Sequence, residues 1–118
     1  MLYVLTIART VLYLARTAVR KSRERLMPRY DAKSDANQSD IVESLRTIGA
    51  TVESLHRVGA GCPDLLVGFR GVNVLMEVKT DKGKLRETQV AWHDEWRGQV
   101  AIVRNADDAF LVLEQVTT

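Results

Sequence analysis

The sequence has few cysteines and no long uncharged run, repeat or low-complexity tract. Its 118 residues include one cysteine, Cys62. A single cysteine cannot form an intramolecular disulfide, and it excludes a zinc site built mainly from cysteines. Low cysteine usage favours a cytoplasmic protein. The hydrophobic share of 46% and the charged share of 27% are those of an ordinary globular protein, so we expect one folded domain.

The N-terminal segment has almost no acidic residues. Residues 1–30 hold seven basic side chains and one acidic side chain, whereas the other 88 residues hold ten basic and fourteen acidic ones. We therefore interpret residues 1–34 as a basic amphipathic leader and linker, and residues 35–118 as the folded domain. The leader could follow DNA, lie on a membrane surface or pair with another chain, and Met27 offers an alternative start. A membrane span is not expected, because Arg9 and Arg16 interrupt a stretch that needs about 20 nearly uncharged residues.

Hydrophobic spacing predicts the order α-β-β-β-α-β-α for the rest of the chain. Residues 28–39 are polar and predict a linker that ends in a helix cap at Ser34 or Asp35. The whole order predicts an α/β fold (an α+β mixed sheet) with helices on the sheet faces. The predicted elements are a helix at 36–48, a strand at 50–58, a hairpin of 64–69 and 73–80 with its turn at Arg70–Asn73, a helix at 85–96, a strand at 100–103 and a short helix at 106–113.

Three charged residues of the predicted hairpin carry the chemistry. Side chains alternate along a strand, so Glu77 and Lys79 share one face and Val78 points to the other. A turn at 70–73 would place Asp64 opposite residue 79, within two positions of Glu77. Two carboxylates at this separation can hold Mg²⁺, with Mn²⁺ as a substitute, and a neighbouring lysine can orient water and stabilise a pentavalent phosphate. The pattern therefore predicts hydrolysis of phosphodiester bonds.

An ordered set of landmarks resembles the PD-(D/E)XK nuclease superfamily and its VRR-NUC branch, which includes small phage and bacterial proteins. The landmarks are Gly61-Cys62-Pro63-Asp64, Glu77-Val78-Lys79, and then Gln89 and Trp92. The resemblance covers about residues 35–113 and implies a restriction-endonuclease-like α-β-β-β-α-β core. It implies a metal-dependent endonuclease acting on duplex or branched DNA, without a small-molecule cofactor, in the cytoplasm of a bacterial or phage-infected cell. It also implies that Asp64, Glu77 and the main-chain carbonyl of Val78 bind the metal, and that Lys79 is the catalytic lysine.

Several positions allow two interpretations. Many relatives carry a metal-supporting glutamate on the first helix, where this sequence has Asn37, with Glu43 further on as either a support or a solvated residue. Gln89 is either a partner in the site or an exposed helical glutamine. Trp92 and Trp96 are interpreted as core residues rather than base-stacking platforms. Three basic side chains after the catalytic lysine either bind phosphates or are simply solvated: Lys82, Lys84 and Arg86.

Two functions compete with cleavage. The missing helix-one glutamate and the basic arm also fit a non-catalytic nucleic-acid-binding module on a nuclease fold. A weaker alternative is a membrane-associated protein driven by residues 1–26. A homodimer is a further expectation, because cutting two strands often uses two active sites.

Overall fold

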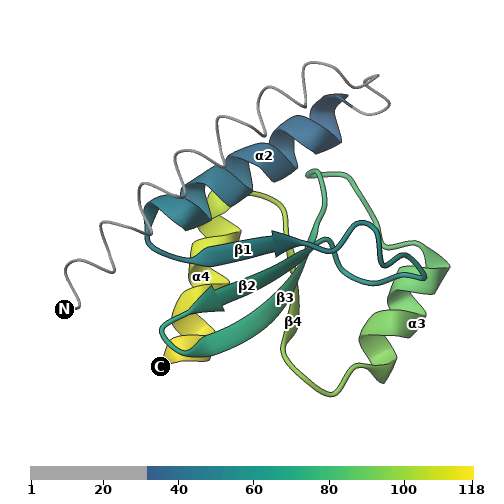
Figure 1. The fold of residues 1–118 in the computed structure, drawn as a ribbon. Helices are drawn as coiled ribbons and strands as arrows, with labels where there is room; N and C mark the ends of the chain where they lie inside the picture. The colour runs from purple at the N-terminus through teal and green to yellow at the C-terminus, as the bar shows by residue number, and fades with distance from the viewer. Residues whose placement is uncertain (1–31) are drawn as a thin grey trace. The chain divides into compact units, whose positions relative to one another are not determined.

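The structure is a computed structural model that describes residues 32–118. The predicted leader up to residue 31, the alternative start at Met27 and the expectations for residues 1–26 lie outside the described residues. The elements follow the predicted order and form an α+β fold around a mixed sheet (Figure 1). They are α2 (Ala32–Thr47), β1 (Thr51–Ser54), β2 (Leu65–Phe69), β3 (Val72–Val78), α3 (Glu87–Glu95), β4 (Val100–Val103) and α4 (Ala106–Thr117).

The four strands lie in the order β1-β2-β3-β4. The first three are joined by antiparallel pairing, and β4 runs parallel to β3. A parallel neighbour needs a crossover connection, which here consists of a loop at residues 79–86 followed by α3. The parallel pairing places the C-terminal ends of β3 and β4 side by side at one edge of the sheet.

The hairpin between β2 and β3 is tighter than predicted. Phe69 pairs with Val72, so the turn contains only Arg70 and Gly71. Both have positive φ values, of 50° and 78°, as a two-residue type I′ turn requires. The predicted turn at Arg70–Asn73 is wrong because Asn73, a common turn residue, lies in β3 and pairs with Gly68. The shorter turn shifts the register by two, so that Asp64 lies in line with Glu77 and not with Lys79.

Three predicted boundaries are also wrong. Residues 32–39 are helical, so the predicted linker and the caps at Ser34 or Asp35 belong to the first turns of α2. The first strand ends at Ser54 instead of residue 58, because a turn follows at once, in which the N–H of Val58 donates to the carbonyl of Leu55 at 2.9 Å. The last helix continues to Thr117, where Val116 still packs against the core.

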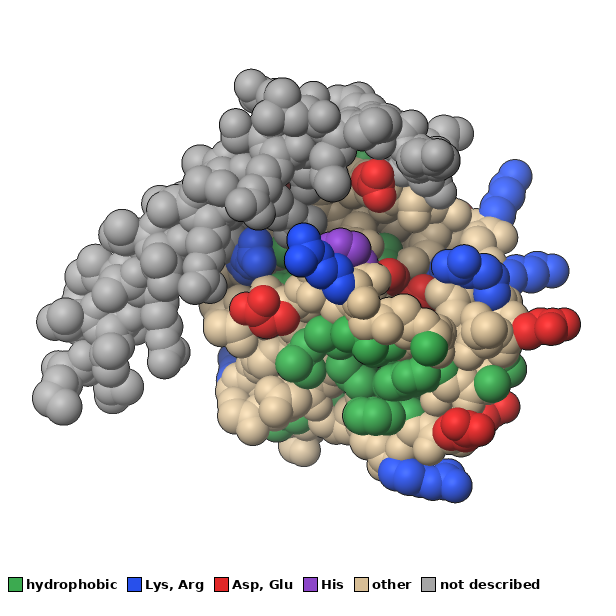
Figure 2. Space-filling model, turned by 45° about the vertical axis from the view of Figure 1, so that its right-hand side comes forward, with side chains coloured by type: hydrophobic (Ala, Val, Ile, Leu, Met, Phe, Trp, Pro, Cys, Tyr) green, Lys and Arg blue, Asp and Glu red, His purple; other side chains and the backbone are tan. Residues whose placement is uncertain are grey.

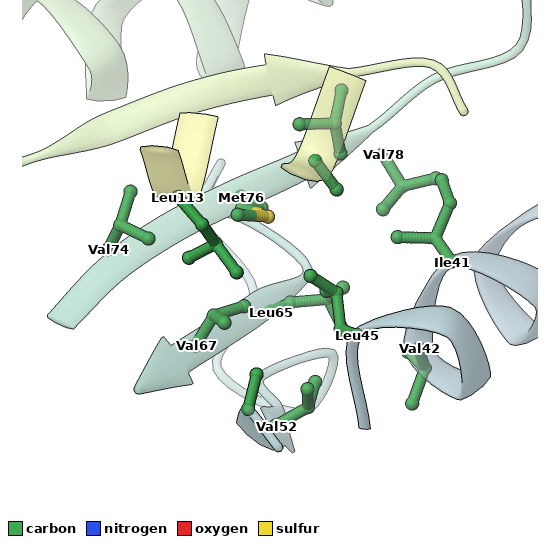
Figure 3. Close-up of a cluster of buried hydrophobic side chains, with 13 residues drawn as sticks. Ile41, Val42, Leu45, Val52, Leu65, Val67, Val74, Met76, Val78 and Leu113 are labelled. Atoms are coloured by element: carbon green, nitrogen blue, oxygen red, sulfur yellow. The ribbon is translucent and has the colours of Figure 1, made fainter. Parts of the chain in front are cut away.

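The core lies on one face of the sheet, between the strands and the helices α2 and α4 (Figure 3). Each strand contributes alternate residues, as pleated strands require. On β3 these are Val74, Met76 and Val78, all buried. The intervening residues of β3, Glu77 among them, therefore project to the opposite face. The helices contribute Ile41, Val42, Leu45, Ala109 and Leu113.

The face of the sheet opposite the core is not packed against α2 or α4. The helix α3 stands apart from α2 and α4 at the other end of the strands (Figure 1). When that side is turned forward, apolar side chains gather in one patch, with acidic and basic side chains around it (Figure 2). Large apolar residues that remain exposed include Leu66, Trp96 and Ile102. None of the helices in residues 32–118 has the length and apolar character needed to cross a membrane.

Candidate active site

Glu77 is the central residue of the site. Its neighbours Met76 and Val78 point into the core, so the Glu77 side chain projects from the other face of β3. Only 2% of Glu77 is exposed. Its Oε1 accepts a hydrogen bond from Nε2 of Gln89 at 2.8 Å and lies 3.4 Å from Nζ of Lys79. Its Oε2 is buried and has no hydrogen-bond partner among the described residues.

The environment of Glu77 disfavours the ionised form of its carboxyl group. Burial is the largest cause that raises the pKa of Glu77, and the charge of Asp64 raises it further. The ammonium of Lys79 acts in the opposite direction, and the balance raises the pKa to about 7. Burial without full pairing is costly for an anion. The site therefore has more negative charge than its own cationic side chain neutralises.

Asp64 is fixed beside Glu77 by the backbone of β3. Its Oδ2 accepts a hydrogen bond from the N–H of Val78 at 2.8 Å. The N–H and C=O of one strand residue point toward the same neighbouring strand. The carbonyl of Val78 therefore faces the side on which Asp64 lies. Asp64 is also close enough to Glu77 for its charge to raise the pKa of Glu77.

Lys79 lies just beyond the end of β3, and its main chain is held on both sides. Its N–H donates to the carbonyl of Val103 at 3.0 Å, and its carbonyl accepts a hydrogen bond from Nδ2 of Asn37 at 3.2 Å. The side chain is 15% exposed, with its ammonium beside Glu77. Lys79 is therefore the one cation in contact with the carboxylate pair in the described part of the chain.

Gln89 completes the cluster from α3. It is 5% exposed, so it is not the exposed helical glutamine of the alternative interpretation. Its Nε2 donates to Glu77, while its Oε1 accepts a hydrogen bond from the N–H of Arg86 at 2.9 Å. Gln89 thus uses one end of its amide to close the first turn of α3 and the other to fix the orientation of Glu77.

Comparison with known proteins bears on the fold that carries this site. No sequence model of a protein family matches the chain, and no curated protein matches it. Among solved structures, one described as a VRR_NUC domain superimposes with a TM-score of 0.59 at 28% sequence identity. The match covers 70% of this chain and 95% of that one.

This structural match supports the resemblance of the chain to the VRR-NUC family. The sheet and helices of the chain form a nuclease-type fold of that family. The candidate site consists of Glu77 on β3, Gln89 on α3, Asp64 just before β2 and Lys79 just after β3. Within residues 32–118, no group of three or more histidine, cysteine and acidic side chains is placed to hold a metal. A cation here would therefore rely on two carboxylates, main-chain oxygen and water.

Gly61 holds the turn before Asp64 against the start of α3. Its φ is +84°, and a Cβ atom there would lie 2.7 Å from the carbonyl carbon of Thr88. We expect Gly61→Ala to lower the free energy of unfolding by more than about 2 kcal/mol, since a left-handed conformation and a backbone clash add together. Urea unfolding measures this change.

Gly59 is the matched control for that substitution. It lies in the same turn with a φ of +70°, but a Cβ atom there would have nothing within 4 Å. Gly59→Ala should therefore cost only the conformational strain of about 1–2 kcal/mol. Equal losses in the two variants would show that the contact between Gly61 and Thr88 is unimportant.

Other predicted residues lie outside the hydrogen-bonded cluster. Glu43 is exposed on α2, and the four site residues form their hydrogen bonds without it. Asn37 does not donate to a carboxylate; its amide donates to main-chain carbonyls. The loop side chains Lys82, Lys84 and Arg86 are exposed on the segment that follows Lys79.

The aromatic residues of α3 correct a further expectation. Trp96 is 45% exposed, so the prediction that it belongs to the core is wrong. Its ring stacks on that of Trp92, with centroids 4.6 Å apart. The reason is that α3 stands apart from α2 and α4 (Figure 1), so its side chains do not join the core that those helices form with the sheet. Cys62 is half-buried, and burial followed by the charges of Glu77 and Asp64 raises its pKa, which favours an unreactive thiol.

Sequence reasoning missed two residues near the site. Nε2 of His93 on α3 is buried without a hydrogen-bond partner in the described residues, and burial is the main cause that lowers the pKa of this imidazole. Arg104 follows β4 and hydrogen-bonds the loop after Lys79. A signal for Arg104 was present: it directly follows a short apolar strand, and parallel strands end at a common edge of the sheet.

Proposed function

We propose that this protein is a divalent-metal-dependent nuclease that hydrolyses phosphodiester bonds in DNA, as an endonuclease on duplex or branched substrates. The observation that carries the proposal is the buried, unpartnered Oε2 of Glu77 beside a second carboxylate. A structure that only binds DNA has no need of two clustered carboxylates, which repel phosphate. A homodimer would supply one such site for each strand.

The residues present fit a hard divalent cation such as Mg²⁺, with Mn²⁺ as a substitute. Oxygen ligands are those that Mg²⁺ prefers, and it commonly retains several waters. Here Asp64, Glu77 and the Val78 carbonyl would provide the protein oxygens. When bound, the ion supplies charge neutralisation at the phosphate and a water of lowered pKa.

The chain's own residues account for the rest of the chemistry. Lys79 places a positive charge next to Glu77, where it can stabilise negative charge on the attacked phosphate and orient the incoming water. Gln89 holds Glu77 in one orientation through Oε1, and Oε2, which has no partner in the described residues, would be left to the ion. Preorganised charges of this kind need no rearrangement during the reaction.

A cleavage assay on linear, flapped and four-way DNA, with and without Mg²⁺ or Mn²⁺, tests the proposal. We expect metal-dependent cleavage by the wild-type protein and a loss of at least about 100-fold in Asp64→Asn. Asparagine keeps an oxygen for the N–H of Val78, so this variant should fold normally, which circular dichroism can verify. Tight DNA binding without cleavage under every condition would instead favour the non-catalytic binding module.

A further inference from the structure

Arg104 binds the backbone of the loop that follows the catalytic lysine. Its Nη1 lies 2.6 Å from the carbonyl oxygen of Thr80 and 2.8 Å from that of Gly83, with the carbonyl oxygen of Asp81 at 3.5 Å. The loop closes on itself through one more bond, from the N–H of Gly83 to the carbonyl of Thr80 at 3.0 Å. The guanidinium thus caps a turn whose carbonyls converge on one point.

Arg104 is itself fixed in place by its main chain. Its N–H donates to Oδ2 of Asp108 in the first turn of α4 at 3.0 Å, and its carbonyl accepts a hydrogen bond from Nδ2 of Asn37 at 3.1 Å. The same amide nitrogen of Asn37 also donates to the carbonyl of Lys79. One side chain of α2 therefore joins the ends of β3 and β4, and Arg104 extends that junction to the loop.

The loop has little else to hold it. It runs from Thr80 to Arg86, and most of its residues are exposed, including the three basic ones, Lys82, Lys84 and Arg86. Ordering a backbone residue costs about 1–2 kcal/mol in conformational entropy, so a loop with few apolar contacts depends on its hydrogen bonds. The two ends of the loop lead directly to Lys79 and, through Arg86, to Gln89.

We propose that Arg104 is a positioning residue, which presents Lys82 and Lys84 to the phosphates of the DNA strand next to the site. This inference rests on the proposed function in that DNA is the ligand. Binding to a preordered loop avoids the entropy of ordering it in the complex. All these contacts come from Nη1, which the planar guanidinium holds in a fixed plane, whereas a lysine ammonium rotates freely on a shorter side chain.

The first test compares Arg104→Met with Arg97→Met in steady-state cleavage. Both remove one positive charge, but Arg97 is an exposed residue outside the loop and the site. For Arg104→Met we expect KM to rise about tenfold while kcat changes less than about threefold, since the lost interaction orders a binding loop. The KM of Arg104→Lys should lie between that of Arg104→Met and that of the wild type. An equal effect of the two methionine variants would overturn the proposal.

The decisive test is a double-mutant cycle with Lys84→Ala. If Arg104 acts by positioning the lysines, removing Lys84 should weaken binding less in the Arg104→Met background than in the wild type. Fully additive effects would show that Arg104 has a separate structural role. If Arg104→Met does not fold, the same cycle can be run with Arg104→Lys, which keeps the charge.

Measuring the Kd for DNA without added metal separates this inference from the proposed function. A wild-type protein that binds DNA but never cleaves it would refute the proposed nuclease activity. The double-mutant cycle, measured as Kd values for DNA, would still confirm or refute the role of Arg104. Cleavage by the wild type together with an unchanged Kd and KM in Arg104→Met would leave the nuclease standing and refute the positioning role.

Discussion

Replacing Lys79 with methionine should lower kcat for DNA cleavage by about a thousandfold or more. The ammonium of Lys79 lies 3.4 Å from Oε1 of Glu77, the one ion pair that Glu77 forms within residues 32–118. Methionine has a similar length and keeps the packing of the stem, so charge is the main property removed. Single-turnover cleavage at saturating protein measures the chemical step directly.

Lys82→Met provides the comparison for this variant. It removes the same charge three residues later, from an exposed loop position. We expect Lys82→Met to raise KM with little change in kcat. The slope of log K for DNA binding against log salt concentration should fall by about one, as expected for the loss of one phosphate contact. Retention of wild-type kcat in Lys79→Met would contradict the assignment of Lys79 as the catalytic lysine.

Replacing Glu77 with glutamine should abolish cleavage and yet stabilise the metal-free protein at pH 8. The pKa of Glu77 is raised from 4.5 to about 7 in the folded state, mainly by burial and then by Asp64. The folded state therefore binds a proton more tightly than the unfolded state between these two values. Stability due to this group is fully present below pH 4.5, falls as the pH rises toward 7 and stays low above it. The difference amounts to about 3 kcal/mol at most, at roughly 1.4 kcal/mol for each unit of pKa.

The pH dependence distinguishes this effect from a general change in packing. Urea unfolding in the presence of a chelator should show Glu77→Gln to be more stable than the wild type at pH 8 and similar to it at pH 4. Glu53→Gln, on the exposed side of β1, should leave the pH profile unchanged. Added Mg²⁺ should stabilise the wild type at pH 8 and not Glu77→Gln. A stability difference that is the same at every pH would contradict this account of Glu77.

The sequence predicted those features that follow from local chemistry. Alternation along β3 separated Glu77 and Lys79 from the core residues Met76 and Val78, and the order of helices and strands was confirmed. The register was not predictable, because the sequence does not show whether Asn73 belongs to the turn or to the strand. With Asn73 in the strand, the register of the hairpin differs from the predicted one by two residues, so Asp64 lies in line with Glu77 and not with Lys79.

Long-range contacts between side chains and backbone were the other features that the sequence did not predict. Asn37 is 42 residues from Lys79 and 67 from Arg104, and it contacts main-chain carbonyls that any residue type could supply. Such contacts leave no pattern of paired residue types in a single sequence. The exposure of Trp96 was missed for a related reason. Helical spacing shows that a helix has an apolar face, but it does not show whether that face packs against the core.

The short outer strands of the sheet constrain how two copies of this protein could associate. In the described part of the chain, β1 and β4 have four residues each and form the two borders of the sheet. A strand of that length offers few free main-chain groups to an incoming chain, which protects against edge-to-edge aggregation. Self-association would then have to depend on side-chain complementarity, with Leu66, Trp96 and Ile102 among the exposed apolar candidates.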